Sequence, residues 1–133
     1  MASIWAEHPL HGPARDWVLR SRAGDVEAVI CQHSLMEVFA SLTGMPSRPR
    51  LGPALVRAAL DETCRTIGIV EIGVEEYRTC LQLAERLGLS GGVVYDLLIL
   101  RAAEQARVDH LVTANSKHFS RLRPDDAGFV VSL

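Results

Sequence analysis

The order of the hydrophobic patterns along this chain is the feature that most limits the fold it can adopt. Short runs rich in β-branched residues alternate with longer segments in which apolar residues recur at helical spacing. Such alternation is typical of parallel strands joined by crossover helices, so we expect an α/β fold. The predicted strands are 28–31, 67–72, 110–113 and 128–131, and the predicted helices are about 9–22, 34–43, 52–65, 74–87 and 92–107.

Proline and glycine residues at the expected helix ends support these boundaries. Pro53 suits the first turn of the helix predicted at 52–65, because the N–H that proline lacks is not needed there. Gly88 suits the end of the helix predicted at 74–87, where left-handed backbone is common. The segment 44–52, GMPSRPRLG, is the one clear long loop.

The length of 133 residues predicts a single domain spanning 1–133, large enough to bury a core without disulfides or metals as staples. The chain is 48% hydrophobic and 23% charged, and none of its apolar runs is long enough to cross a membrane. The start, MASIW, lacks the basic region and the apolar stretch of a secretory signal. We therefore expect a cytoplasmic protein with no membrane partner.

The net charge of −2 argues against a protein that holds nucleic acid by broad neutralisation of phosphates, because that mode needs a basic face. Any contact with nucleic acid must then be local. The three cysteines, Cys31, Cys64 and Cys80, are odd in number and widely spaced. This pattern predicts reduced thiols that serve as small core residues, and it matches neither a disulfide framework nor a zinc motif.

One carboxylate, Asp96, lies inside the apolar run from Val93 to Leu100. An ionised carboxylate among aliphatic side chains costs several kcal/mol or more unless a cation or hydrogen-bond donors compensate it. The nearest basic residue, Arg101, is five positions away, outside the spacing of three or four that brings helical neighbours together. A bound metal ion would supply the missing positive charge.

Two further polar residues are expected at the same edge of the sheet as Asp96. Glu37 is expected in the first turn of the helix that follows the strand ending near Cys31, and Asn115 follows the strand ending at Thr113 by two residues. In an open parallel sheet the ligand crevice lies at the carboxyl ends of the strands, where the following helices begin. Two carboxylates and an amide oxygen suit magnesium or manganese better than zinc.

Each of these residues also has a purely structural interpretation. Ser34 and Glu37 match the capping box S-x-x-E, so Glu37 could simply hold the start of a helix. Asp96 near a helix N-terminus is favoured by the helix dipole. Asn115 is an ordinary loop residue that can bond its own backbone. The metal-site hypothesis depends on the convergence of the three.

The histidines and the basic side chains give weaker signals. His8 and His11 have a spacing seen in metal sites, but Pro9 interrupts it. His33 and His118 could each approach substrate, although solvated loop residues are the better interpretation. Charged runs usually form a solvated face, although phosphate binding is an alternative for six basic residues, foremost the loop arginines and Lys117. These six are Arg48, Arg50, Arg57, Lys117, Arg121 and Arg123.

Three segments, SLMEVFASL, GGVVYDLLILRAA and LVTANSKHF, resemble PIN-domain ribonucleases of the VapC toxin type in their order and spacing. The resemblance covers nearly the whole chain, and the segment GG-x-x-YD-x-LI is its most specific part. It implies a three-layer α/β/α domain with a central parallel sheet, in which acidic residues hold Mg²⁺ or Mn²⁺ and activate water to cut RNA. It also implies a cognate antitoxin protein and a homodimer as partners.

Carried over by position, Glu37 and Asp96 match the second and third acidic residues of the family, and Asn115 falls where the fourth is aspartate or asparagine. The resemblance thus implies that these three are the catalytic metal ligands. Thr113 matches the threonine that commonly precedes the fourth position. Together with the candidate phosphate binders Lys117 and Arg50, it completes the expected contacts with the RNA substrate.

The sequence departs from the family at its amino terminus. The family begins with a short apolar strand that ends in an aspartate, whereas MASIWAE resembles the helix that follows that strand. We expect the loss of this strand to unpair the middle of the sheet and to leave two carboxylates at the site. Two explanations are a start internal to a longer reading frame and a degenerate, inactive domain.

Two rivals to the nuclease interpretation follow. A PIN-like protein-interaction module could keep the fold while lacking metal and activity, and the missing aspartate supports this alternative. A nucleotide-binding α/β domain is weaker, because Gly91 and Gly92 follow no predicted strand and build no phosphate loop.

Overall fold

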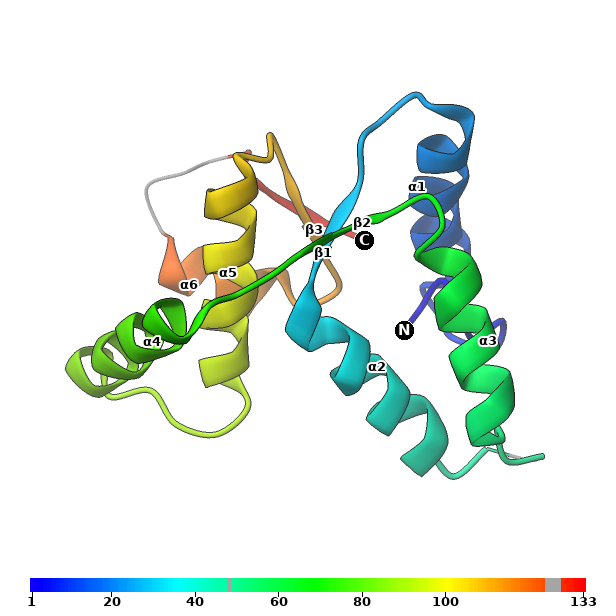
Figure 1. Ribbon diagram of the computed structural model, residues 1–133, viewed down its shortest axis with the longest axis horizontal. Coiled ribbons are helices and arrows are strands. Elements are labelled where there is room, and N and C mark those ends of the chain that lie inside the picture. The colour runs from blue at the N-terminus through cyan, green and yellow to red at the C-terminus, as the bar shows by residue number, and fades with distance from the viewer. Residues whose placement is uncertain (48, 124–127) are drawn as a thin grey trace. The chain divides into compact units, whose positions relative to one another are not determined.

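Helices and short strands alternate along the chain in the computed structural model, as the hydrophobic pattern predicts (Figure 1). The structure describes residues 1–47, 49–123 and 128–133, with only the backbone of Ser120. The chain divides into two compact units, Met1–Ile69 and Val70–Leu133. The expectation of a single domain stays a prediction.

The first unit is built mainly from helices. Its elements are α1 (His11–Ala23), β1 (Val29–Cys31), α2 (Gln32–Gly44), α3 (Pro53–Thr63) and β2 (Gly68–Val70), whose last residue opens the second unit. Helix α2 packs against α3 and contacts β1. Strand β2 approaches β1 closely: the Gly68 N–H donates to the Ala28 carbonyl at 2.9 Å. A Cβ on Gly68 would lie 3.2 Å from Val29 Cγ1, so glycine permits this approach.

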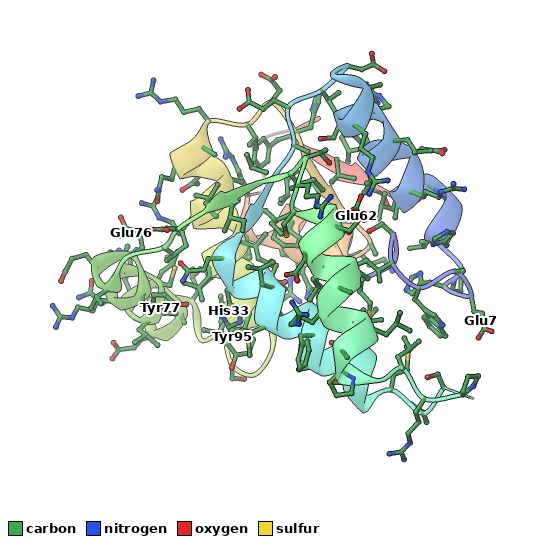
Figure 2. The ribbon with its side chains drawn as sticks, turned by 45° about the vertical axis from the view of Figure 1, so that its right-hand side comes forward. Glu7, His33, Glu62, Glu76, Tyr77 and Tyr95 are labelled. Carbon is green, nitrogen blue, oxygen red and sulfur yellow. The ribbon has the colours of Figure 1, made fainter. Side chains whose placement is uncertain are left out.

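One ion pair on the surface of the first unit joins α1 to α3. Glu62 on α3, labelled in Figure 2, accepts from Arg22 Nη2 at 3.3 Å and lies 3.4 Å from Arg65 Nε. The Ser21 hydroxyl on α1 donates to the Thr66 carbonyl at 2.9 Å. Exposed pairs of this kind contribute little each, about 0–1 kcal/mol, so the buried apolar residues supply most of the stability.

The second unit carries two long helices and a parallel strand pair. Its elements are α4 (Val74–Leu87), α5 (Val93–Ala106), β3 (Leu111–Thr113), α6 (Ser116–Leu122) and β4 (Val130–Ser132). Helix α4 packs on α5, and α6 contacts both α5 and β4. Strands β3 and β4 are parallel, with Leu111 opposite Val130 and Thr113 opposite Ser132.

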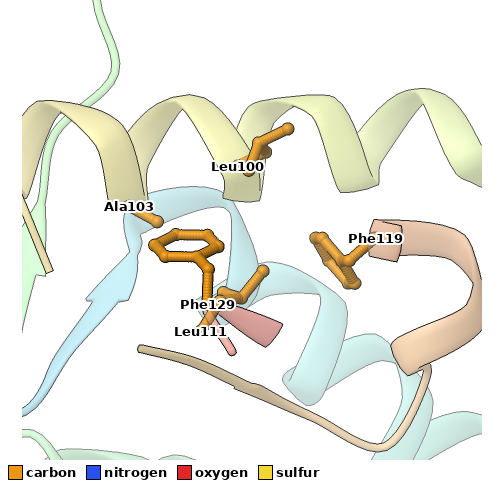
Figure 3. Close-up of a cluster of buried hydrophobic side chains, with 5 residues drawn as sticks. All are labelled: Leu100, Ala103, Leu111, Phe119 and Phe129. Atoms are coloured by element: carbon orange, nitrogen blue, oxygen red, sulfur yellow. The ribbon is translucent and has the colours of Figure 1, made fainter. Parts of the chain in front are cut away.

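The core of the second unit joins α5, α6 and β3. Buried side chains from these elements and from the residue just before β4 meet in one cluster (Figure 3). Its members are Leu100, Ala103, Leu111, Phe119 and Phe129. Because Leu100 and Ala103 are separated by three positions on α5, they share one face of that helix, and this face packs on α6 and β3.

Most expected elements are confirmed, with shifts of a few residues at their ends. Pro53 occupies the first turn of α3, and Gly88 ends α4 with a left-handed φ of 62°. Helix α2 ends at Gly44 and α3 begins at Pro53, in keeping with the expected loop, of which Arg48 lies outside the described residues. Helix α6 was not predicted, because seven residues are too few for helical periodicity to stand out.

The single central sheet that we expected is wrong for the described residues. Their strands form two separate two-stranded sheets, β1–β2 and β3–β4, while the α/β class and the parallel pairing are confirmed. A sheet is continuous only where neighbouring strands exchange backbone hydrogen bonds across about 4.8 Å. Within the described chain, each three-residue strand has one neighbour only, so the ladder stops after a pair.

Two of the three cysteines serve as small core residues, as expected: Cys31 and Cys80 are buried, whereas Cys64 is only half-buried. Within the described residues, none of the helices combines the length and the apolar character that crossing a bilayer would need.

Candidate functional site

Asp96 lies in the first turn of α5, on the face that continues into the core of the second unit. Asp96, Leu100 and Ala103 are spaced by four and three residues, so they follow one stripe along the helix. Leu100, one turn further along this face, is buried, and the Asp96 side chain itself is only 15% exposed. The carboxylate that the sequence places within an apolar run is therefore largely shielded from solvent in the folded chain.

Arg101 does not compensate the charge of Asp96, in agreement with its unsuitable spacing. The Arg101 guanidinium instead donates to Glu104 Oε2 at 2.5 Å, one turn further along α5. The group that does reach Asp96 is an imidazole from α6. His118 Nδ1 lies 2.9 Å from Asp96 Oδ2.

Helix α6 is held in place by Phe119, which is 2% exposed and packs into the core cluster with Leu100 and Phe129 (Figure 3). Consecutive residues of a helix point about 100° apart, so burying Phe119 also fixes the direction in which His118 projects. Phe119 therefore anchors α6 in the core, and His118 next to it supplies the imidazole. The burial of Phe119 thus turns the His118 imidazole toward α5.

Asn115 completes a cluster of three polar side chains. Its amide Nδ2 lies 2.6 Å from the same His118 Nδ1 that contacts Asp96. The backbone N–H of Asn115 donates to Thr113 Oγ1 at 3.0 Å, which fixes the turn between β3 and α6. Asp96 and Asn115, both expected at this edge of the sheet, are thus brought to one atom of a third residue.

His118 is a residue of this cluster that the sequence did not place among the expected site residues. We expected it in a solvated loop, but it lies in α6 and its side chain is 44% exposed. The signal that could have found it is its spacing of three from Asn115, which places the two on one helical face if a helix begins there. His8 and His11 bond locally instead: His8 Nδ1 accepts from the Leu10 N–H, and His11 Nδ1 lies 3.0 Å from the Ala2 carbonyl.

Glu37 belongs to α2 in the first unit, and its expected convergence with Asp96 stays a prediction. The predicted capping box is wrong: α2 begins at Gln32, with Cys31 as its N-cap and no hydrogen bond from a capping side chain. Glu37 therefore lies in the second turn rather than the first. Its half-buried carboxylate helps to raise the pKa of the Cys31 thiol, for which burial is the larger cause, while the backbone N–H groups of His33 and Ser34 lower it.

The three residues expected to contact RNA differ in their exposure and in their hydrogen bonds. Lys117 on α6 is exposed next to His118, and Arg50 is exposed in the loop before α3. Thr113 is half-buried at the end of β3, where its hydroxyl accepts the Asn115 N–H. Two other basic candidates have protein partners, since Arg57 pairs with Asp61 and Arg123 stacks on Phe129.

The donors that meet in the second unit fit a hard metal ion. The described residues contain no group of three or more histidine, cysteine, aspartate or glutamate side chains suited to a metal. Asp96 and Asn115 nevertheless offer a carboxylate and an amide oxygen. Magnesium is commonly held by one or two carboxylates while it keeps several waters, so such a set is compatible with it.

The parallel strand pairs, the covering helices and a carboxylate at the start of a helix define a mixed α/β domain with an acidic candidate site. The sequence model of the PIN domain matches residues 1–123, and the chain belongs to this family. PIN domains are a family of nucleases, generally dependent on a metal and typically on Mg²⁺. No curated protein matches the chain significantly.

Proposed function

We propose that this PIN domain is a metal-dependent endoribonuclease of the VapC type, the toxin of a type II toxin–antitoxin system. The observation that carries the proposal is the meeting of Asp96 and Asn115 at His118 Nδ1, at 2.9 and 2.6 Å. Nineteen positions separate the two residues in the sequence, and both match acidic positions of the family that the sequence resembles.

In this mechanism, Asp96 and Glu37 would hold Mg²⁺ or Mn²⁺ through their carboxylates, and Asn115 would hold it or one of its waters through the amide oxygen. When bound, such an ion lowers the pKa of a water and neutralises phosphate charge. The Asp96 side chain is only 15% exposed, so its carboxylate is largely shielded from bulk water, which strengthens its interaction with a cation. Thr113 orients Asn115 by accepting its backbone N–H.

The proposed substrate is single-stranded or looped RNA. Asp96 is largely buried, and a splayed backbone can reach a recessed carboxylate that a duplex cannot approach. Lys117 is exposed within two residues of Asn115, so its ammonium group can contact a phosphate next to the scissile bond. Arg50 is a second proposed phosphate contact, and the net charge of −2 is consistent with local contacts of this kind.

The proposed partners are a cognate antitoxin protein and a second copy of the chain. Support comes from the resemblance to VapC toxins and from an exposed apolar stripe on α4, to which Tyr77, labelled in Figure 2, contributes together with Val74 and Leu81. These three residues recur at spacings of three and four, so they share one face of the helix. Leu55 on α3 is similarly exposed.

The alternative is a PIN-like interaction module without catalysis. The observation that favours it is that the cluster at His118 contains one carboxylate, Asp96, and that no larger group of metal-binding side chains occurs among the described residues. This alternative predicts neither manganese binding nor cleavage, while binding to a protein partner would persist.

Cleavage of a fluorescent single-stranded RNA by the full chain tests the proposal, with Mg²⁺, with Mn²⁺ and with excess chelator. A duplex of the same sequence is the matched substrate control. We expect metal-dependent cuts in the single strand, with little cutting of the duplex. Cleavage that persists with the chelator would overturn the metal-dependent mechanism. No cleavage with either metal, together with no manganese binding by calorimetry, would favour the interaction module.

A further inference from the structure

We propose that His118 is a positioning residue for Asp96: its Nδ1–H donates to Asp96 Oδ2, which fixes the carboxylate and leaves Oδ1 to bind the metal. This inference rests on the proposed metal site and assigns a role to a residue outside the expected ligand set. The contact that carries it is the 2.9 Å separation of His118 Nδ1 from Asp96 Oδ2.

The chemistry of the cluster decides which ring nitrogen carries the proton. A carboxylate offers only acceptors, so an Nδ1 lone pair 2.9 Å from Oδ2 would place two electron pairs face to face. A proton on Nδ1 turns this contact into a hydrogen bond. Neutral His118 is then the Nδ1–H tautomer, with the lone pair on Nε2.

Asn115 fits the same assignment. Its amide approaches His118 Nδ1 to 2.6 Å, and a half turn of the amide exchanges Nδ2 for the oxygen Oδ1. The amide oxygen at this place can accept the Nδ1–H, which it shares with Asp96, and its second lone pair stays free for the metal or a bound water. The amide N–H would instead meet the Nδ1–H, donor against donor. One imidazole N–H thereby links the two residues that match acidic positions of the family.

The packing of α6 keeps the His118 imidazole next to Asp96. Phe119, the neighbour of His118, is buried between α5 and β3 with Leu100 and Leu111 (Figure 3). Rotating α6 to withdraw the imidazole would expose Phe119. His118 is therefore presented to Asp96 by the same packing that builds the core.

Direct ligation of a metal by His118 Nδ1 is the competing role. It requires Nδ1 without a proton, and it would shift the preference of the site toward transition metals, because imidazole suits them better than it suits magnesium. A positioning role affects magnesium and manganese alike, because the lost group orients an oxygen ligand common to both.

The test measures manganese affinity by calorimetry and magnesium affinity by competition, with the full chain and three variants at position 118. His118→Asn keeps an N–H donor near the position of Nδ1, His118→Gln places its donor near Nε2, and His118→Leu keeps the bulk without a donor. We expect a loss of about 10- to 100-fold for the Leu and Gln variants with both metals, and recovery to within about threefold for His118→Asn. Circular dichroism verifies that each variant folds.

Nitrogen NMR of the His118 imidazole gives a readout independent of the metal. We expect the Nδ1–H tautomer in the unmodified chain and its loss in Asp96→Ala. Unchanged manganese affinity in a folded His118→Leu variant, or an Nε2–H tautomer in the unmodified chain, would overturn the positioning role. A loss confined to manganese would identify His118 as a ligand instead, whereas a folded unmodified chain that binds neither metal would overturn the proposed function itself.

Discussion

His118 Nδ1 lies 2.9 Å from Asp96 Oδ2, although 22 positions separate the two residues in the sequence. One of them belongs to the start of α5 and the other to the middle of α6, and the packing of Phe119 beneath α5 brings them together. The contact links a carboxylate largely shielded from solvent to a half-exposed imidazole. It makes the amino-terminal end of α5 the centre of the candidate site.

Asp96→Asn should reduce RNA cleavage by at least about 100-fold, because it removes the carboxylate charge that a metal needs while conserving shape. The measurement is the initial rate of cleavage with Mg²⁺. Asp109→Asn is the matched control, since it makes the same change at an exposed position of the same unit. Equal activity of both variants would remove Asp96 from the site.

Glu37→Gln should lower cleavage by about 10- to 100-fold if Glu37 is a second metal ligand. The same variant has a second measurable effect near position 37, because the Glu37 carboxylate contributes to the raised pKa of the Cys31 thiol. Removing the charge should lower that pKa, which is measured by the pH dependence of Cys31 alkylation. Glu27→Gln, at an exposed position, is the control. A lowered pKa with full activity would show that Glu37 lies near Cys31 but outside the metal site.

Phe119→Ala should destabilise the chain by about 3–5 kcal/mol, the usual cost of removing a buried aromatic ring. Urea unfolding measures the change, with Tyr95→Ala as the control because Tyr95 is a large but exposed aromatic residue. The variant should also lose the Nδ1–H signal of His118, since α6 is no longer anchored. A cost below about 1 kcal/mol would contradict the packing of α6 against α5.

Lys117→Ala should raise the KM for RNA by about two- to fivefold and leave kcat nearly unchanged, as expected for an exposed charge worth roughly 0.5–1 kcal/mol. Steady-state cleavage at low ionic strength measures both constants. Lys117→Arg retains the charge and should behave like the unmodified chain. An unchanged KM in Lys117→Ala would show that the RNA follows another path.

The free energy of unfolding should fall as the pH rises above about 9. Burial raises the pKa of the Cys31 and Cys64 thiols above the ordinary value of 9.0, with nearby carboxylates adding to the effect. Below that value the folded and the unfolded chain both keep the thiol proton, so the free energy of unfolding does not depend on these thiols. Above it the unfolded chain releases the proton more readily, which favours unfolding. Urea unfolding between about pH 8 and 10.5 checks the slope, and Cys31→Ala with Cys64→Ala should make it shallower.

The sequence by itself determined the helices and strands whose hydrophobic period is long enough to read. It also identified Asp96, because a carboxylate within a run of leucines and valines is anomalous wherever the chain folds. Asn115 could be placed beyond a strand end from its two-residue distance to Thr113. These are local properties, since they depend on neighbours along the chain and on general backbone geometry.

The tertiary structure alone decided that His118 meets Asp96, and that the strands of the described chain pair in two separate sheets. Helix α6 is too short to be recognised by periodicity, and its orientation depends on Phe119 finding a place between α5 and β3. Strand pairing likewise depends on which backbones come within hydrogen-bonding distance. The physical reason is the same in both cases: contacts between distant segments are selected by packing, which the local pattern of residues does not specify.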